Sequence, residues 1–198
     1  MVISVKEHGL AYSAVPKAGC TSVKAMLAEI DPKISYPEAK EVGGDVWHTL
    51  YPTRRWRGDV FSQYEGSFRF TVVRDPIKRL MSVYTNRVID RKELHNSRKL
   101  QYRKSMPMDP DPDTFFANLM TYAELSSVIK HHILPTWMFT GTDLSLYNKV
   151  YRTEQIGELA EDLSEISGKK ISLQRANKSR TKLNFEELTP YTRDLLRP

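Results

Sequence analysis

AVPKAGCTSVKAML, from Ala14 to Leu27, is the stretch of sequence that decides the fold prediction. It overlaps the end of LAYSAV (Leu10 to Val15), an apolar run with the composition of a β-strand. Thr21 is a suitable helix cap, and the sequence predicts a helix from there to about Ile30. A strand, a glycine-containing loop and a helix form the opening unit of an α/β fold.

The loop inside this stretch has an unusual order of lysine and glycine. Lys17 comes two residues before Gly19, whereas the common nucleotide-binding loop places its lysine directly after the last glycine. A strand that enters a helix through small polar residues still presents backbone N–H groups and the positive end of the helix dipole. The segment from Lys17 to Ser22 is therefore a candidate phosphate site. The alternative is an ordinary strand-to-helix turn with a solvated lysine.

Strand and helix patterns alternate along the rest of the chain. FRFTVV (Phe68 to Val73) is apolar enough for a buried parallel strand, and Asp75 and Pro76 suit the start of a following helix. KVYRTE (Lys149 to Glu154) predicts another strand, followed by a helix with an apolar stripe between residues 156 and 166. The predicted fold class is α/β, with a central, mostly parallel sheet flanked by helices.

Three further segments are predicted from local composition. DVWHTLYP (Asp45 to Pro52) is a candidate short strand, and a helix is expected from about Thr114 to Ile129. Residues 87–104 carry seven Lys or Arg against two acidic residues, which is typical of a polar helix. This basic run is either a solvated helix face or a rim that attracts an anionic substrate.

The overall composition is that of a soluble globular protein with a single domain, residues 1–198. Thirty Lys and Arg against 24 Asp and Glu give a net charge of +6, which suits an anionic partner. A single cysteine excludes an intrachain disulfide. No apolar run approaches the roughly 20 residues that span a bilayer, and the N-terminus lacks the features of a secretory signal. A cytoplasmic protein is therefore expected.

Two motifs together resemble the nucleotide site of sulfotransferases that use 3′-phosphoadenosine 5′-phosphosulfate (PAPS). VPKAGCTSVK (Val15 to Lys24) is similar to their 5′-phosphosulfate loop, and its Pro-Lys-x-x-Cys-Thr form resembles the carbohydrate (Golgi-type) branch. VVRDPIKRLMSVYTN (Val72 to Asn86) resembles their 3′-phosphate site, in which a strand-ending Arg is followed eight residues later by a Ser. Arg74 and Ser82 match these positions. An Arg can fork onto a phosphate, and a helix serine adds a hydroxyl donor.

The resemblance implies a P-loop-like sulfotransferase fold that binds PAPS as donor and 3′-phosphoadenosine 5′-phosphate (PAP) as product, without a metal ion. ANKSR, late in the chain, is similar to an Asn-x-Ser element that closes over the nucleotide in this family. The implied cofactor-binding residues are Lys17, Ala18, Gly19, Cys20, Thr21, Ser22, Arg74, Ser82, Asn177, Ser179 and Arg180. The implied acceptor is a hydroxyl, less often an amine, of a carbohydrate or glycolipid. Neither nucleic acid nor a membrane span is expected.

Sulfuryl transfer needs a cation at the leaving oxygen and usually a base for the acceptor proton. Lys17 is suited to the first task, as the resemblance also implies. His48 is the first candidate for the catalytic base, because related sulfotransferases carry a histidine between the two motifs, at the end of a strand. His131 and His132, in KHHILPTW, stay open as alternatives.

Two other functions stay open beside the sulfotransferase interpretation. One is a nucleotide-dependent small-molecule kinase with a variant phosphate loop, which would depend on ATP and Mg²⁺. The other is a non-catalytic basic module that binds nucleotide or nucleic acid. The chain also departs from relatives that carry a membrane anchor and lumenal disulfides. The resemblance reaches TPYTRDLLRP and stops, so a short domain or a missing C-terminal part is expected.

Overall fold

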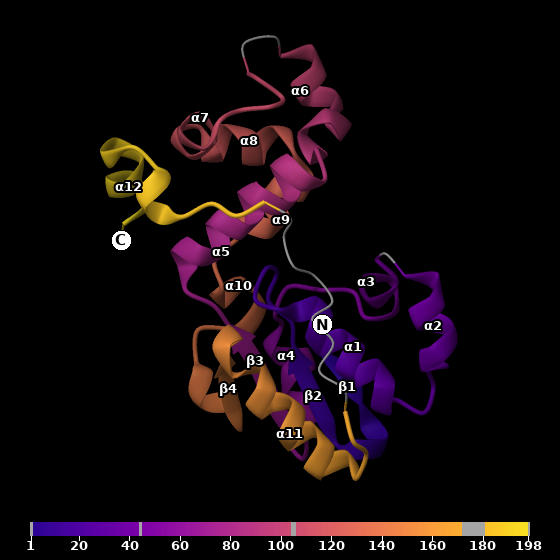
Figure 1. The fold of residues 1–198 in the computed structure, drawn as a ribbon. Coiled ribbons are helices and arrows are strands. Elements are labelled where there is room, and N and C mark those ends of the chain that lie inside the picture. Colours follow the sequence, from indigo (N-terminus) through magenta and orange to yellow (C-terminus); the bar gives the residue numbers. More distant parts are fainter. Residues whose placement is uncertain (1, 44, 104–105, 172–180, 198) are drawn as a thin grey trace. The chain divides into compact units, whose positions relative to one another are not determined.

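The structure, a computed structural model, describes residues 2–43, 45–103, 106–171 and 181–197 (Figure 1). Its internal contacts divide the chain into two compact units. The first combines residues 1–74 and 135–177, and the second combines residues 75–134 and 178–198. The single domain expected from the chain length stays a prediction.

The first unit is built on a four-stranded sheet in the order β1-β2-β3-β4. Its strands are β1 (Ile3–Val5), β2 (Leu10–Ser13), β3 (Phe68–Val73) and β4 (Lys149–Arg152). β2, β3 and β4 run parallel to one another, whereas β1 pairs with β2 in the antiparallel direction. The predicted α/β class with a mostly parallel sheet is confirmed, and the short edge strand β1 adds to it.

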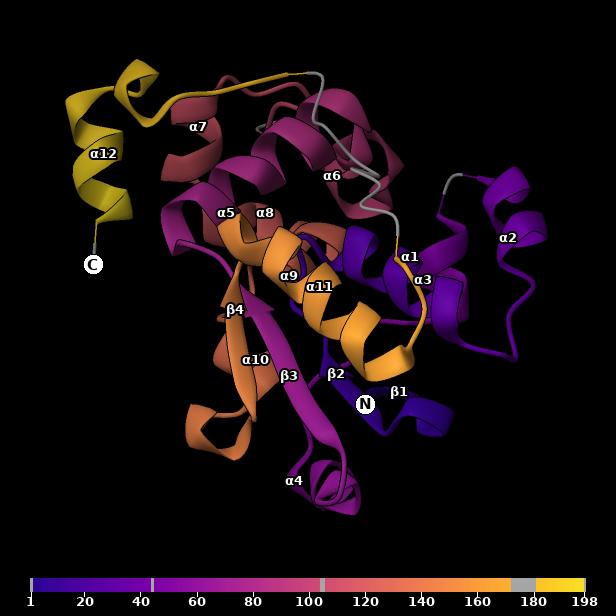
Figure 2. The same ribbon diagram turned by 60° about the horizontal axis from the view of Figure 1, so that its bottom comes forward.

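Helices cover both faces of this sheet. The helices of the first unit are α1 (Cys20–Ile30), α2 (Tyr36–Val42), α3 (Val46–Leu50), α4 (Gly58–Phe61), α10 (Trp137–Thr140) and α11 (Ile156–Ser167). Tyr12 and Phe70 stack at a centroid distance of 5.0 Å on the face where α1 and α11 pack. α11 runs across this face in Figure 2. Ala11 points to the opposite face, where Phe61 of α4 and Tyr147 complete a second, smaller core.

The helix after β4 agrees with its prediction. Leu159, Ala160 and Leu163 are the buried positions of α11, at the three- and four-residue spacing of an apolar stripe. Gly168 follows its last residue in the left-handed conformation, with φ of 67°, as expected for a glycine that ends a helix.

Two local predictions in the first unit are wrong. The N-cap of α1 is Gly19 rather than Thr21, because the chain enters the helix through a left-handed residue with φ of 75°. Residues 45–52 contain the helix α3 instead of a strand. Trp47 is the buried residue of α3 and stacks on Tyr36 of α2 at 5.5 Å. A single turn of helix buries this one large side chain without the neighbouring strand that an extended segment would need.

The second unit is helical within the described residues. Its helices are α5 (Pro76–Val83), α6 (Arg98–Tyr102), α7 (Pro112–Ala117), α8 (Leu119–Leu125), α9 (Ser127–Ile133) and α12 (Pro190–Leu196). Asp75 caps α5 as predicted, since its carboxylate accepts the Lys78 backbone N–H at 2.8 Å. A π-helical segment, Tyr84–Asp90, continues α5. Short 3₁₀ helices in the two units are Lys6–His8, Ser62–Tyr64, Glu93–Asn96, Leu144–Leu146, Thr153–Gln155 and Phe185–Glu187.

The continuous helix predicted from Thr114 to Ile129 is wrong, because α7, α8 and α9 divide this segment. The chain leaves the helical conformation at Ser126, which becomes the N-cap of α9 and accepts the backbone N–H of Ile129. Serine competes with helical hydrogen bonding in this way. The basic run is likewise broken into the end of the π-helical segment, a 3₁₀ helix and α6 rather than one polar helix.

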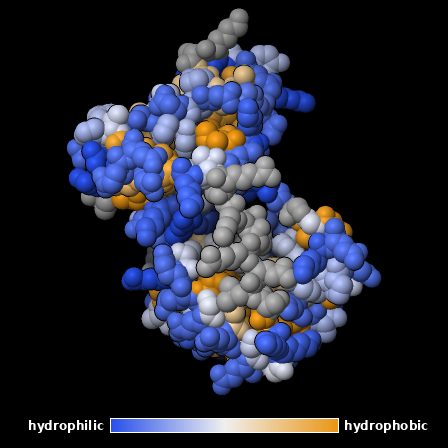
Figure 3. Space-filling view, viewed as in Figure 1, coloured by the Kyte–Doolittle hydropathy of each residue, from blue (hydrophilic) through white to orange (hydrophobic). Residues whose placement is uncertain are grey.

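Aromatic side chains form the centre of the second unit's core. Tyr84, Phe115 and Phe116 lie with ring centroids 5.3 to 5.8 Å apart. Hydrophilic residues occupy most of the surface in view in Figure 3, and apolar residues form small separate patches there. Among the described residues, no helix is both long enough and apolar enough to cross a membrane.

Arg79 on α5 is a buried cation in this unit, with 4% of its surface exposed. Its guanidinium donates to the carbonyl oxygens of His132, at 2.9 Å, and Leu134, at 2.6 Å. These carbonyls lie at the carboxyl end of α9, where a helix has no internal donors for them and carries partial negative charge. Arg79 therefore joins α5 to the end of α9.

Replacing Arg79 by leucine should lower the free energy of unfolding by about 2–4 kcal/mol, because buried carbonyls lose charged donors. Urea unfolding followed by circular dichroism measures this loss. Lys78→Met removes an exposed cation from the same helix and should change stability by less than about 0.5 kcal/mol. Equal stability of the two variants would contradict a structural role for Arg79.

Candidate functional site

The predicted phosphate loop lies between the carboxyl end of β2 and the amino end of α1. Lys17 and Gly19 both have left-handed backbone conformations, with φ of 65° and 75°. This conformation is rare for a residue with a Cβ, so the turn at Lys17 stores strain, as functional loops often do. The turn leads into α1, whose first N–H groups have no carbonyl partners within the helix. The loop thus has the backbone geometry of an anion-binding helix entrance.

Gly19 is required by space as well as by conformation. A Cβ at this position would lie 2.6 Å from Cδ1 of Ile156, the first residue of α11. The first residue of α11 therefore packs closely against the loop at Gly19.

Arg74 brings the second motif to this loop. It follows the last residue of β3, and its Nη1 donates to the Lys17 carbonyl oxygen at 3.1 Å. Because β2 and β3 are parallel neighbours, their carboxyl ends meet at the same edge of the sheet. The loop lysine and the strand-ending arginine, 57 residues apart in sequence, therefore share one site.

His48 also lies at this site, although it stands on the helix α3 and not at the end of a strand. Its Nε2 is 3.0 Å from the hydroxyl oxygen of Thr21, on the first turn of α1. The half-buried imidazole is thus in direct contact with a residue of the phosphate loop. Thr21, expected to cap the helix, instead uses its hydroxyl to contact the histidine.

Sequence reasoning did not find Lys24. This lysine is on the second turn of α1, is completely buried, and has its Nζ 3.0 Å from His48 Nδ1. Nζ also donates to the Thr53 hydroxyl at 2.7 Å. The available signal was its spacing: Lys24 lies four residues from Cys20 and Ala28, two buried residues on the same face of the helix.

The remaining predicted site residues are not all described. Ser82 lies on α5 in the second unit and is partly buried. Asn177, Ser179 and Arg180 lie outside the described residues. His131 and His132 are in the last turn of α9, also in the second unit, and their rings make an edge contact at 5.2 Å. Nδ1 of His132 is 2.7 Å from the Val128 carbonyl, and this hydrogen bond lies within α9.

The residues at the loop suit an anion that carries phosphate or sulfate groups. The loop supplies the lysine cation, hydroxyl groups and the amide donors of a helix entrance, and the guanidinium of Arg74 is tied to its carbonyl. A strand-loop-helix turn at the carboxyl edge of a parallel sheet is the position where α/β proteins bind nucleotides. The fold and the site are thus those of an α/β protein with a candidate phosphate loop, and a histidine lies beside this loop.

This chain belongs to the Sulfotransferase family, whose model matches residues 1–197. The match confirms the resemblance predicted from the two motifs. No curated protein and no solved structure matches the chain.

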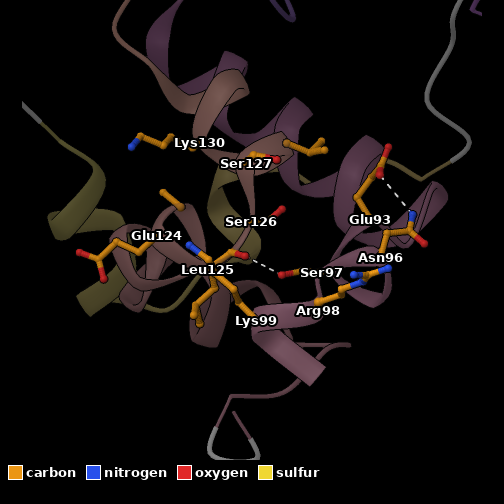
Figure 4. Close-up of a pocket in the computed structure, with 12 residues that line it drawn as sticks. Glu93, Asn96, Ser97, Arg98, Lys99, Glu124, Leu125, Ser126, Ser127 and Lys130 are labelled. Carbon is orange, nitrogen blue, oxygen red and sulfur yellow. Dashed lines mark hydrogen bonds between the residues drawn. The ribbon is translucent and has the colours of Figure 1, made fainter. Parts of the chain in front are cut away.

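The second unit contains a pocket of about 390 Å³ (Figure 4). Its lining residues are Glu93, Asn96, Ser97, Arg98, Lys99, Ala123, Glu124, Leu125, Ser126, Ser127, Val128 and Lys130. The Ser97 hydroxyl donates to the Leu125 carbonyl, as the dashed line in Figure 4 marks. Arg98 and Lys99 belong to the basic run, so part of that run lines a concave surface.

Gly19→Ala should destabilise the protein by roughly 1–2 kcal/mol, because alanine resists the left-handed conformation. The contact with Ile156 should add to this cost, and Ile156→Val in the same chain should recover the added part alone. Thermal and urea unfolding measure both values. Gly66→Ala, at an exposed glycine with open space around it, is the matched control and should be close to neutral. A neutral Gly19→Ala would contradict the loop geometry.

Proposed function

We propose that this sulfotransferase transfers the sulfuryl group of PAPS to a hydroxyl, less often an amine, of a carbohydrate or glycolipid. The observation that carries the proposal is the contact between His48 Nε2 and the Thr21 hydroxyl, 3.0 Å apart, beside a loop suited to phosphate. It puts a group that can take a proton next to the place where a phosphosulfate would be held. Family membership supports the reaction type.

In this proposal the donor's two phosphate ends have separate sites. The amides of residues 18–22, with the hydroxyls of Thr21 and Ser22, hold the 5′-phosphosulfate. Arg74 and Ser82 hold the 3′-phosphate, and Asn177, Ser179 and Arg180 complete the nucleotide site. The hydrogen bond from Arg74 to the Lys17 carbonyl supports a position for Arg74 beside the loop that would hold the 5′-phosphosulfate. The single cysteine favours a cytoplasmic setting.

The donor supplies a sulfuryl group activated by a phosphate leaving group. The protein has to orient the acceptor hydroxyl in line with that group, stabilise charge at the leaving oxygen and remove the acceptor proton. Lys17 supplies the positive charge at the leaving oxygen. His48 takes the acceptor proton at Nε2, the nitrogen that faces the loop.

The acceptor is proposed to contact the basic run. Arg98 and Lys99 line the pocket of the second unit together with hydroxyl and amide groups, which suits an acceptor with both hydroxyl and anionic groups. Glu93 and Glu124 in the same pocket offer acceptors for sugar hydroxyls.

PAP should bind more tightly than adenosine 5′-phosphate, because the 3′-phosphate adds charged hydrogen bonds. Arg74→Ala should remove this preference, and Lys17→Ala should weaken both nucleotides together. Calorimetric titration of each variant with each nucleotide gives the four affinities. Arg57→Ala removes an exposed arginine paired with Asp59 and is the control that should change neither affinity.

The comparison of nucleotides separates phosphate binding by Arg74 from its support of the loop. If Arg74→Ala lowered both affinities by the same factor, Arg74 would act only on loop geometry. A wild-type protein that did not prefer the 3′-phosphate, or that preferred ATP with Mg²⁺, would overturn the proposed donor.

His48→Gln should lower kcat by about 10²–10⁴-fold and leave PAP affinity nearly unchanged, because a general base acts on the acceptor and not on nucleotide binding. Radiolabelled PAPS with a panel of sugar acceptors measures transfer. His132→Gln is the matched control, and the proposal expects a much smaller loss. The opposite order of losses would transfer the role of the base to the second unit.

A further inference from the structure

Lys24 presents a buried amine to His48, and among the described residues no carboxylate is paired with this amine. Within the described part of the chain its polar partners are His48 Nδ1 and the Thr53 hydroxyl. An ammonium group has three donors and no acceptor, and a buried charge without an opposite charge is unfavourable. Burial accordingly lowers the pKa of Lys24, while the Cys20 thiol on the same helix, when ionised, opposes this change. The surroundings therefore make the uncharged amine easier to form than for a lysine in water.

The protonation state of Lys24 decides which nitrogen of His48 carries hydrogen. An ammonium can only donate, so Nδ1 must accept and the neutral imidazole must carry its hydrogen on Nε2. Nε2 would then donate to the Thr21 oxygen and could not act as a base. An uncharged Lys24 can instead accept a hydrogen bond from Nδ1–H. The lone pair of Nε2 then faces the loop, as a base requires.

We propose that Lys24 positions the His48 ring and is the final acceptor of the proton that His48 takes up. The two residues together form a Lys24–His48 proton relay. This proposal rests on the proposed role of His48 as base. The acceptor oxygen forms its bond to sulfur as the bond between sulfur and the donor's phosphate oxygen breaks, and that electron pair leaves with the phosphate. The acceptor's proton moves to His48 Nε2, and the Nδ1 proton moves to the lone pair of Lys24 Nζ.

The direction of the pH dependence follows from this relay. The active pair contains a neutral amine and a neutral imidazole, so activity should rise as the pair loses its shared proton. A pair that can place one added proton on either member binds it more readily than the imidazole alone, and the apparent pKa belongs to the pair. Without Lys24, the acidic limb of the kcat/KM profile should therefore move to lower pH.

Substitutions at Lys24 separate the relay from simple support of the ring. The informative changes are Lys24→Gln, Lys24→Met and Lys24→Arg. Glutamine can accept from Nδ1–H but cannot take the proton, methionine does neither, and arginine is permanently charged and forces hydrogen onto Nε2. The relay predicts that kcat/KM falls in the order lysine, glutamine, methionine, arginine, with at least about a tenfold loss for methionine.

A purely structural role predicts a different result, because arginine keeps the charge and the donor. Recovery of activity in Lys24→Arg above Lys24→Met would overturn the relay. PAP affinity within about threefold of the wild-type value shows that each variant has kept its fold and nucleotide site, since Lys24 is not proposed to touch the nucleotide.

Nitrogen NMR of protein labelled with ¹⁵N-histidine tests the relay without catalysis, with His48→Gln used to assign the signals. His48 should carry hydrogen on Nδ1 at high pH and shift it to Nε2 as the pair takes up a proton. Lys24→Met should lose this exchange of nitrogens. Hydrogen on Nε2 at every pH would overturn the relay. A protein with the expected exchange but without sulfuryl transfer from PAPS would instead contradict the proposed function.

Discussion

The parallel pairing of β2 with β3 is the constraint on which the site depends. It brings the carboxyl ends of two strands to one edge of the sheet, and Arg74 can then reach the Lys17 carbonyl at 3.1 Å. This contact corresponds to the unusual sequence position of Lys17, two residues before Gly19. Lys17 lies inside the turn in a left-handed conformation, before the helix, where its carbonyl can accept the hydrogen bond from Arg74.

Helices that pack on the sheet supply the residues that surround the loop. α11 lies against Gly19, and α3 carries His48 to the first turn of α1. Lys24 then contacts the other nitrogen of the same imidazole from one turn further along α1. The loop, His48 and the buried amine therefore depend on three helices, α1, α3 and α11, and one short turn of the same compact unit.

Much of this arrangement could be predicted from sequence, since the strands and the loop are encoded by local runs. FRFTVV matches β3 in full, and Asp75 caps its helix as its residue type indicates. Other features depend on tertiary burial, which local composition does not carry. The burial of Trp47 selects a helix where the composition favours a strand, and Lys24 and Arg79 are basic side chains that only the folded chain reveals as buried.

An experimental structure of the complex with PAP tests the central claim most directly. The proposal predicts the 5′-phosphate on the amides of residues 18–22 beside Lys17, and the 3′-phosphate on the Arg74 guanidinium and the Ser82 hydroxyl. Thr21 would then lie between the 5′-phosphate and His48. A nucleotide bound away from this loop, or a 3′-phosphate that contacts neither Arg74 nor Ser82, would contradict the assignment of the site.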